Sequence, residues 1–261
     1  MKSRFPLLLK TFLYSTLLTP CILGLSLVIS PIAQAQSRSG YNPPPSSGTD
    51  TNSDNRGGGG TRGECDGSEA ISLTTLAPQG HIGQTASTHP TFAWFVSASE
   101  LPPMEFLLFE QRPGKMPERI GRIELQASPG IGSLSLPKDK PGLSVGKRYL
   151  WRVAIICEPN RPSTTVIADA EVDVVEMPPT LTKSLSNTTS GLERARLYAR
   201  SGLWYDSFAE VLGSGDSTFR EFRLALLEDL ATLEESGDSE RERLYGTRLR
   251  ELVEILTTSQ P

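Results

Sequence analysis

Short apolar segments separated by turn signals fill the middle of the chain, and this pattern restricts the fold more than any other feature. Pro-Gly pairs and one Pro-Pro pair stand between the segments, and such residues supply the fixed and positive φ angles of tight turns. Every second residue from Tyr149 to Ile155 is aromatic or β-branched, so these residues share one face of a strand. The pattern predicts seven strands, at 71–78, 90–97, 104–111, 119–126, 132–137, 148–157 and 164–175.

Short strands at this spacing favour an antiparallel β-sandwich, which we place at residues 63–178. The stretch LSVGKRYLWRV (143–153) resembles the turn and strand of immunoglobulin-like and fibronectin type III domains. The resemblance implies that the Tyr149 hydroxyl bonds backward to the backbone and that Trp151 lies in the core. The alternative is that Tyr149 is an ordinary cross-strand aromatic residue.

Helical periodicity replaces the strand pattern over residues 188–257, so the predicted fold class is α+β. Glycines at 202 and 213 end the first two helices, Thr218 and Glu221 form a possible capping box for the third, and Asp238 caps the fourth. The segment 197–212 resembles one tetratricopeptide-type helix-turn-helix. Because no 34-residue repeat is visible, an independent α-helical hairpin is equally consistent with the sequence.

The first 35 residues read as a secretory signal peptide. Lys2 and Arg4 precede a mostly apolar run over 7–32, and Ala33-Gln34-Ala35 matches an A-x-A processing site. We expect cleavage after Ala35 and an exported protein, located in the periplasm or outside the cell. The alternative is a retained membrane anchor, which the lysine and proline inside the apolar run disfavour.

The mature chain is acidic and begins with a polar stretch. It carries 23 basic and 30 acidic residues, because the leader holds three of the 26 basic residues and no acidic one. This balance argues against a nucleic-acid partner, and the mature chain has no second apolar run that could span a membrane. Residues 36–62 hold almost no apolar side chains, so we predict a disordered Gly/Pro/Ser-rich linker there.

Two cysteines remain after cleavage, Cys65 and Cys157. In an oxidising compartment they are expected to form one intramolecular disulfide, with free thiols or intermolecular pairing as alternatives. Closing a loop of 91 intervening residues stabilises the fold by about 4 to 5 kcal/mol in the chain-entropy model. Two cysteines and two distant histidines do not have the spacing of a metal site.

No motif in the sequence identifies a catalytic or cofactor-binding site. The stretch GGGGTRGEC (57–65) lacks the preceding strand and the GK[ST] ending of a phosphate-binding loop. His81 and His89 flank GQTAST and are interpreted as solvent-facing turn residues. We therefore predict no catalytic residue, no cofactor and no metal.

A possible binding surface is the remaining candidate. Trp94 and Trp151 lie in strand patterns and are expected in the core, whereas Trp204 follows a helix turn and stands in no strand. We expect this surface to contact an envelope protein or a glycan in a non-catalytic role. The alternatives are a carbohydrate-binding sandwich or a hydrolase acting on envelope polymers. The surface is predicted to comprise Trp204, Tyr205, Asp206 and Arg161.

Several motifs occur in a fixed order: TRG-x-C, LTTLAP, PTFAWFV, EFLLFE, GIGSLSLP, LSVGKRYLWRVAIICEPNRPS and AxSGLWYDSF. Together they resemble the cyanobacterial family of domains of unknown function 928 (DUF928), over residues 57–256. The sequence departs from the pattern around 213–222, which affects only the helical part. The resemblance implies a cyanobacterial origin and export, and it brings no established activity, cofactor or catalytic residue.

Overall fold

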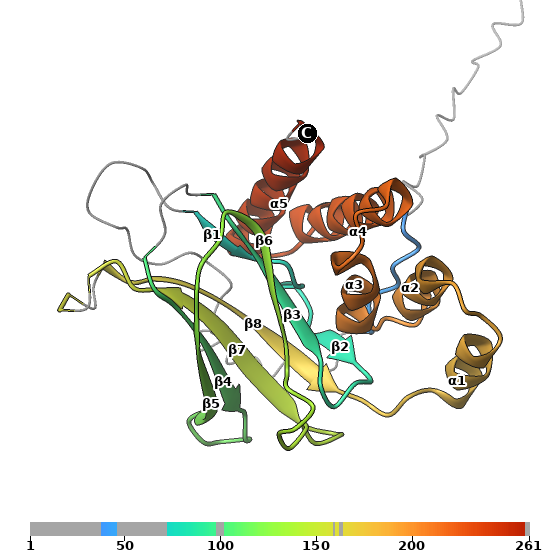
Figure 1. Cartoon of the computed structure of the whole chain (residues 1–261), viewed down its shortest axis with the longest axis horizontal. Helices are drawn as coiled ribbons and strands as arrows, with labels where there is room; N and C mark the ends of the chain where they lie inside the picture. The colour runs from blue at the N-terminus through green and yellow to red at the C-terminus, as the bar shows by residue number, and fades with distance from the viewer. Residues whose placement is uncertain (1–37, 46–71, 98–101, 159, 162–163, 259–261) are drawn as a thin grey trace, which may run out of the picture. The chain divides into compact units, whose positions relative to one another are not determined.

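Strands precede helices along the chain in the computed structural model, which describes residues 38–45, 72–97, 102–158, 160–161 and 164–258 (Figure 1). All seven predicted strands are present, and the pattern missed β2 and α1. The strands are β1 (Leu73–Thr75), β2 (Gly83–Thr85), β3 (Thr91–Val96), β4 (Met104–Glu110), β5 (Glu118–Leu125), β6 (Gly130–Ser135), β7 (Arg148–Ile155) and β8 (Val166–Val174). The helices are α1 (Pro179–Ser186), α2 (Gly191–Arg200), α3 (Trp204–Leu212), α4 (Ser217–Glu235) and α5 (Glu240–Thr258).

The strands form two sheets. One contains three strands in the order β1-β3-β6 and is antiparallel throughout. The other contains five strands in the order β2-β8-β7-β4-β5, and its pairs are antiparallel except for the parallel β2–β8 pair. An α+β fold with antiparallel sheets is thus confirmed, while this pairing does not establish an immunoglobulin-like topology.

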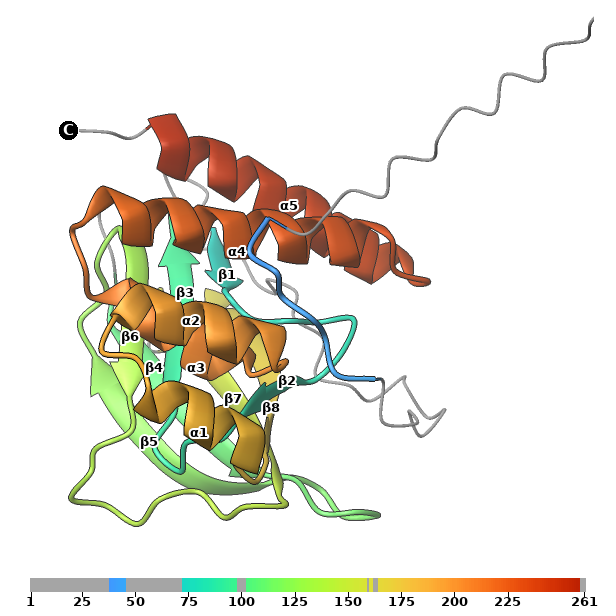
Figure 2. The same cartoon turned by 90° about the vertical axis from the view of Figure 1, so that its right-hand side faces the viewer.

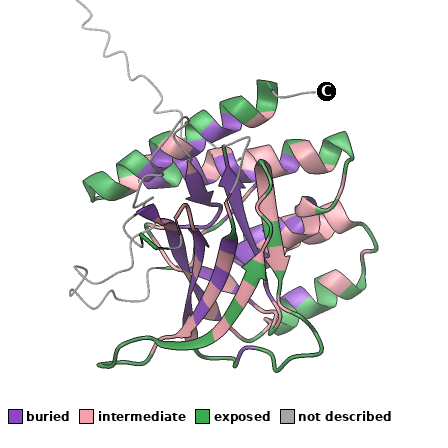
Figure 3. Cartoon of the chain, turned by 60° about the vertical axis from the view of Figure 1, so that its left-hand side comes forward, coloured by how far each residue is buried: buried purple, intermediate pink, exposed green. Residues whose placement is uncertain are grey.

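Aromatic side chains join the two sheets. The Phe92 ring on β3 lies 5.1 Å from the rings of both Phe106 on β4 and Trp151 on β7. Trp151 is fully buried, as the strand pattern predicts. The Ser144 backbone N–H donates to the Tyr149 hydroxyl at 3.0 Å, which confirms the backward bond expected of this tyrosine. Burial is deepest between the sheets and under the helices, whereas β5 and β6 are largely exposed or half-buried (Figure 3).

Helices α2 to α5 share the hydrophobic core of the sheets, and α1 packs against α2 (Figure 2). Helices α2 and α3 form the predicted hairpin, and Gly202 at its turn has a φ of 76°, which glycine adopts without strain. Helix α3 contacts β2 and β3. A Cβ on Gly83 of β2 would lie 2.8 Å from the Tyr205 ring, so the strand and the helix approach closely because this residue is glycine.

Two helices start at other residues than the sequence predicted. The side chain of Asp216 caps α4 by accepting the Thr218 N–H at 2.7 Å, so Thr218 lies inside the helix. The expected cap of α5 at Asp238 is also wrong. There the Ser239 hydroxyl accepts the Glu242 N–H at 3.1 Å and the Glu242 carboxylate accepts the Ser239 N–H at 3.3 Å. In both cases a side-chain oxygen one or two residues away satisfies the free N–H groups of the first turn.

Part of the predicted linker is ordered on the body of the protein. Residues 38–45, called the N-terminal segment below, bury Ser39 and Tyr41 to 4% exposure each. The prediction of disorder is wrong there. Residues 36–62 are polar on average, but they include Tyr41, whose aromatic ring packs on the body of the protein. The predicted signal peptide and Cys65 lie outside the described residues. Among the described helices, none is both long and apolar enough to cross a membrane.

Candidate functional site

The residues of the predicted binding surface do not share a surface. With the N-terminal segment on the body, Trp204 is fully buried and Tyr205 is 2% exposed, so neither aromatic ring is available to a ligand in solution in this state. Arg161 is exposed and pairs with Glu158 at 3.2 Å in the connection between β7 and β8, away from α3 (Figure 1). The predicted surface therefore loses its two aromatic members.

Both aromatic side chains connect α3 to the sheets instead. The Trp204 indole N–H donates to the Leu76 carbonyl at 3.0 Å, and its ring stacks on Phe208 at 5.5 Å. The Tyr205 hydroxyl accepts the Trp151 indole N–H at 2.8 Å and donates to the Glu171 carbonyl at 2.8 Å. Because these contacts satisfy polar groups in or beside the core, the sequence motif around Trp204 has a structural role.

Asp206 fixes the connection after β2. Its carboxylate accepts the Ala86 N–H at 2.9 Å. Burial raises the pKa of Asp206 to about 6, although the bonds from the Ala86 N–H and the Thr85 hydroxyl lower it. The Asp206 side chain is half-buried and stabilises this loop, so its contacts indicate a structural role.

His81 is also not the solvent-facing turn residue that the sequence suggested. It is half-buried, and its Nε2 is hydrogen bonded to the Tyr41 hydroxyl at 2.8 Å. Burial lowers the pKa of His81 to about 4, so the ring is neutral at neutral pH. His89 is half-buried too, with its Nε2 3.0 Å from the Lys140 carbonyl oxygen. The two histidines thus contact different parts of the chain: His81 contacts the N-terminal segment, and His89 contacts the connection between β6 and β7.

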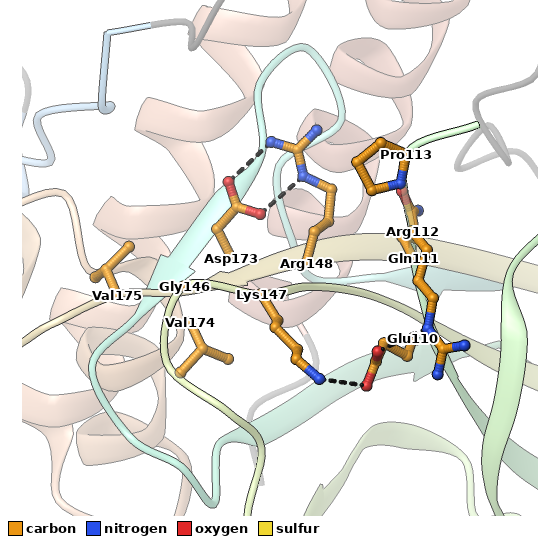
Figure 4. A pocket seen from close by; sticks show the side chains of 10 residues that line it. All are labelled: Glu110, Gln111, Arg112, Pro113, Gly146, Lys147, Arg148, Asp173, Val174 and Val175. Carbon is orange, nitrogen blue, oxygen red and sulfur yellow. Dashed lines mark hydrogen bonds and ion pairs between the residues drawn. The ribbon is translucent and has the colours of Figure 1, made fainter. Parts of the chain in front are cut away.

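A polar depression of about 570 Å³ opens at one end of the five-stranded sheet (Figure 4). Four chain segments meet there: the end of β4, the β4–β5 turn, the start of β7 with the residues before it, and the end of β8. The residues lining it are Glu110, Gln111, Arg112, Pro113, Gly146, Lys147, Arg148, Asp173, Val174 and Val175.

Ion pairs organise the rim of the polar depression. Arg148 binds Asp173 through two hydrogen bonds, of 2.8 and 2.9 Å, on one side, and Lys147 binds Glu110 at 3.0 Å on the other (Figure 4). Arg112 donates a further bond to Glu110 at 3.0 Å. Hydrogen bonds from Arg112 and Lys147 hold the pKa of Glu110 below its usual range, so this carboxylate is ionised at neutral pH.

The polar depression offers charge of both signs to a ligand. Three basic and two acidic side chains line it, and those of Arg112 and Lys147 are 45% and 46% exposed. It contains no cysteine, serine or histidine that could act as a nucleophile or a base. Within the described residues, no three His, Cys, Asp or Glu side chains gather in a way that could hold a metal ion. This arrangement suits recognition of a charged segment.

Sequence reasoning missed these residues because charged side chains near strand ends are common. The Pro-Gly turn at 113–114 and the glycine at 146 mark turns without indicating that the turns meet. Only the strand order, which places β4, β7 and β8 side by side, brings the residues together.

The fold and the site define an α+β protein with aromatic links between sheet and helices and an open, charged depression at a sheet end. A family model described as Domain of Unknown Function (DUF928) matches residues 57–226. This match covers more than half of the chain, so the protein belongs to that family.

Other comparisons add little. Two solved structures of superoxide reductase (neelaredoxin) from Ignicoccus hospitalis, one of them a point variant, share 12% and 15% sequence identity with the chain. They match 40% and 41% of this chain and 79% and 80% of their own, with TM-scores of 0.26 and 0.24. Scores this low support no conclusion about fold or activity. No curated protein matches the chain.

Proposed function

We propose that this protein is an exported, non-catalytic binding module of the cell envelope, and that the polar depression contacts a polypeptide segment carrying charges of both signs. The observation that carries the proposal is the convergence of five charged side chains from separate chain segments around one open depression. Complementary charge at such a surface mainly gives specificity and speeds association.

The ion pairs on the rim do not block a partner. Ion pairs at a protein surface contribute only about 0 to 1 kcal/mol each; here the basic members are open to solvent, while the side chains of Glu110 and Asp173 are 13% and 21% exposed. The side chains of Lys147 and Arg148 are 46% and 36% exposed, which leaves both accessible. A partner that brings a carboxylate to Lys147 and a basic group to Glu110 would keep every charge paired.

The proposal of export rests on the amino-terminal sequence. A basic start, an apolar run and the Ala33-Gln34-Ala35 site support secretion, and we place the protein in the periplasm or outside a cyanobacterial cell. The Tyr149 corner supports an immunoglobulin-like or fibronectin-like sandwich. The α2–α3 hairpin with its glycine turn supports a tetratricopeptide-like unit.

A polypeptide partner is favoured over a glycan or an envelope polymer undergoing hydrolysis. Glycan sites commonly present an aromatic face to the sugar, and Trp204, the candidate for that role, is fully buried. The two polar residues of the predicted binding surface, Asp206 and Arg161, lie on α3 and in the β7–β8 connection, so they come from separate elements.

Affinity capture with matched charge variants tests the proposal. We expect the mature protein to retain a polypeptide from envelope extract, and Arg112→Ser/Lys147→Ser to retain about tenfold less of it, which corresponds to about 1.4 kcal/mol. Retention should fall as salt is raised, because exposed charges are screened.

The control variant is Arg122→Ser/Lys138→Ser, which removes two exposed positive charges outside the polar depression. It should retain the same polypeptide as the wild-type protein. Equal retention by both double variants, or no polypeptide that depends on Arg112 and Lys147, would count against the proposed function.

The predicted disulfide gives a separate test of export. Mass spectrometry of the unreduced mature protein should find a peptide containing Cys65 joined to one containing Cys157, because an oxidising compartment favours the bridge. The same experiment should find Gln36 as the first residue. Alkylation of both cysteines without prior reduction would contradict the bridge.

A further inference from the structure

The N-terminal segment lies on the body like a bound peptide. It runs from α4 past α2 and α3 toward β2 (blue in Figure 2). It forms no helix or strand. One backbone–backbone hydrogen bond joins it to the described body, from the Asn42 N–H to the Ala199 carbonyl at 3.1 Å. Its attachment depends mainly on side chains.

Asp229 on α4 is the polar anchor for the first residues of the segment. Its carboxylate accepts the Arg38 N–H at 3.0 Å, the Ser39 N–H at 2.7 Å and the Ser39 hydroxyl at 2.5 Å. The neighbouring Glu228 pairs with the Arg38 side chain at 2.6 Å. Three donors on one carboxylate, with a second carboxylate beside it, favour a basic residue followed by serine.

Tyr41 is the apolar anchor. Its ring meets the Trp204 ring edge-on at 5.0 Å, and its hydroxyl is hydrogen bonded to His81 Nε2 at 2.8 Å. Gly40, between Ser39 and Tyr41, has a φ of 73°, a conformation that favours glycine. These contacts therefore favour a peptide with the sequence basic residue, serine, glycine and tyrosine.

The Trp204 wall of the Tyr41 site is held by contacts that do not involve the segment. Trp204 is fixed by its bond to Leu76 and by stacking on Phe208. At the edge of the site, Gly202 allows the segment to approach closely, since a Cβ there would lie 3.0 Å from the Asn42 carbonyl oxygen. The Trp204 wall is therefore preformed, and departure of the segment would break no strand pairing.

We propose that Asp229, His81 and Trp204 form a recognition site for a short peptide of the chemistry basic-Ser-Gly-Tyr, and that the N-terminal segment occupies it as a tethered ligand. A polypeptide with the same chemistry would compete for the site. This site is separate from the polar depression, and the inference does not depend on the function proposed for that depression.

Because the N-terminal segment belongs to the same chain as the site, it lowers the apparent affinity of the site for a competing free peptide. A ligand that belongs to the same polypeptide chain as its site has an effective concentration on the order of millimolar. A free peptide therefore binds the wild-type protein weakly even when the site is specific. Weakening the chain's own segment should open the site to the same peptide supplied in solution.

The test is fluorescence anisotropy with a labelled peptide of the sequence SRSGYNPPP, which matches Ser37–Pro45. We expect the mature Tyr41→Ala protein to bind it at least about tenfold more tightly than the wild-type protein. The peptide SRSGANPPP should not bind. Adding Asp229→Asn to Tyr41→Ala should abolish binding, whereas adding Asp139→Asn, which changes an exposed carboxylate elsewhere, should not.

A second variant keeps the test decisive if Tyr41→Ala does not fold. Arg38→Glu/Ser39→Ala removes the Ser39 hydroxyl bond to Asp229, places a negative charge beside Glu228 and leaves Tyr41 in place, and it should also raise the affinity for the free peptide. If both folded variants bind the peptide no better than the wild-type protein, the segment is an integral part of the core and the proposal is wrong. A wild-type dimer that the free peptide dissociates would also overturn it, since the segment would then bind a second copy.

Discussion

Tyr205→Phe is expected to lower the free energy of unfolding by about 2 to 4 kcal/mol, because it removes one hydroxyl that serves two partners. The Trp151 indole N–H loses its acceptor, and the Glu171 carbonyl loses a donor. Trp151 is fully buried and Tyr205 is 2% exposed, so water does not easily replace the missing group at the indole. The ring itself stays, which limits the change to the hydrogen bonds.

Urea unfolding measures this loss, with Tyr198→Phe as the matched control. Tyr198 lies on the neighbouring helix α2 and is half-buried, and its hydroxyl has no hydrogen-bond partner among the described residues. We expect the control to lose less than about 0.5 kcal/mol, as is usual away from special contacts. Equal losses in the two variants would show that the Tyr205 hydroxyl does not connect the helix to the sheets.

The strands could be predicted because their pattern is local. Alternation along β7 and apolar runs such as β3 appear in the sequence itself, and turn residues mark their ends. The strand β2 could not be predicted, since Gly83–Thr85 is too short to show a period and exists through its pairing with β8. Helix α1 was missed for a similar reason, because Leu181 is its one buried residue.

The candidate site was less predictable than the fold. The sequence predicted Trp204 and Tyr205 as members of a binding surface, but both are buried, because their exposure depends on the sheet against which α3 packs. The polar depression joins residues from distant segments, and their charges give no signal of proximity. The N-terminal segment is ordered although its composition is polar, because Tyr41 contacts Trp204 and His81. These contacts exist only in the folded protein, so the composition does not reveal them.

Glu234 on α4 makes the stability of the protein depend on pH. It is 1% exposed, and its carboxylate accepts the N–H groups of Gln79 and Gly80 at 2.7 and 2.8 Å. Burial raises its pKa to about 7 from an ordinary value of 4.5; those two N–H bonds lower it and Glu242 raises it further. The folded state therefore holds a proton between pH 4.5 and 7 that the unfolded state releases. The stabilisation is complete below the unfolded pKa and is lost as pH rises through the folded pKa.

Two other groups change stability over a neighbouring range. Asp206, with a pKa raised to about 6, acts in the same direction as Glu234. His81, with a pKa lowered to about 4, acts in the opposite direction. Its contribution to the stability of the protein is lost as pH falls from 6.5 through about 4. Comparing a Glu234 variant with the wild-type protein at each pH cancels both contributions.

Glu234→Gln is expected to become more stable relative to the wild-type protein by about 2 to 3 kcal/mol between pH 5 and pH 8.5. The amide is neutral at every pH, and its oxygen can still accept the N–H groups of Gln79 and Gly80. Urea unfolding at several pH values measures the difference. Glu235→Gln is the control: hydrogen bonds from Arg250 lower the pKa of Glu235, so its difference from the wild-type protein should stay constant over this range. A constant difference for Glu234→Gln as well would mean that Glu234 is ionised in the folded protein at about pH 5.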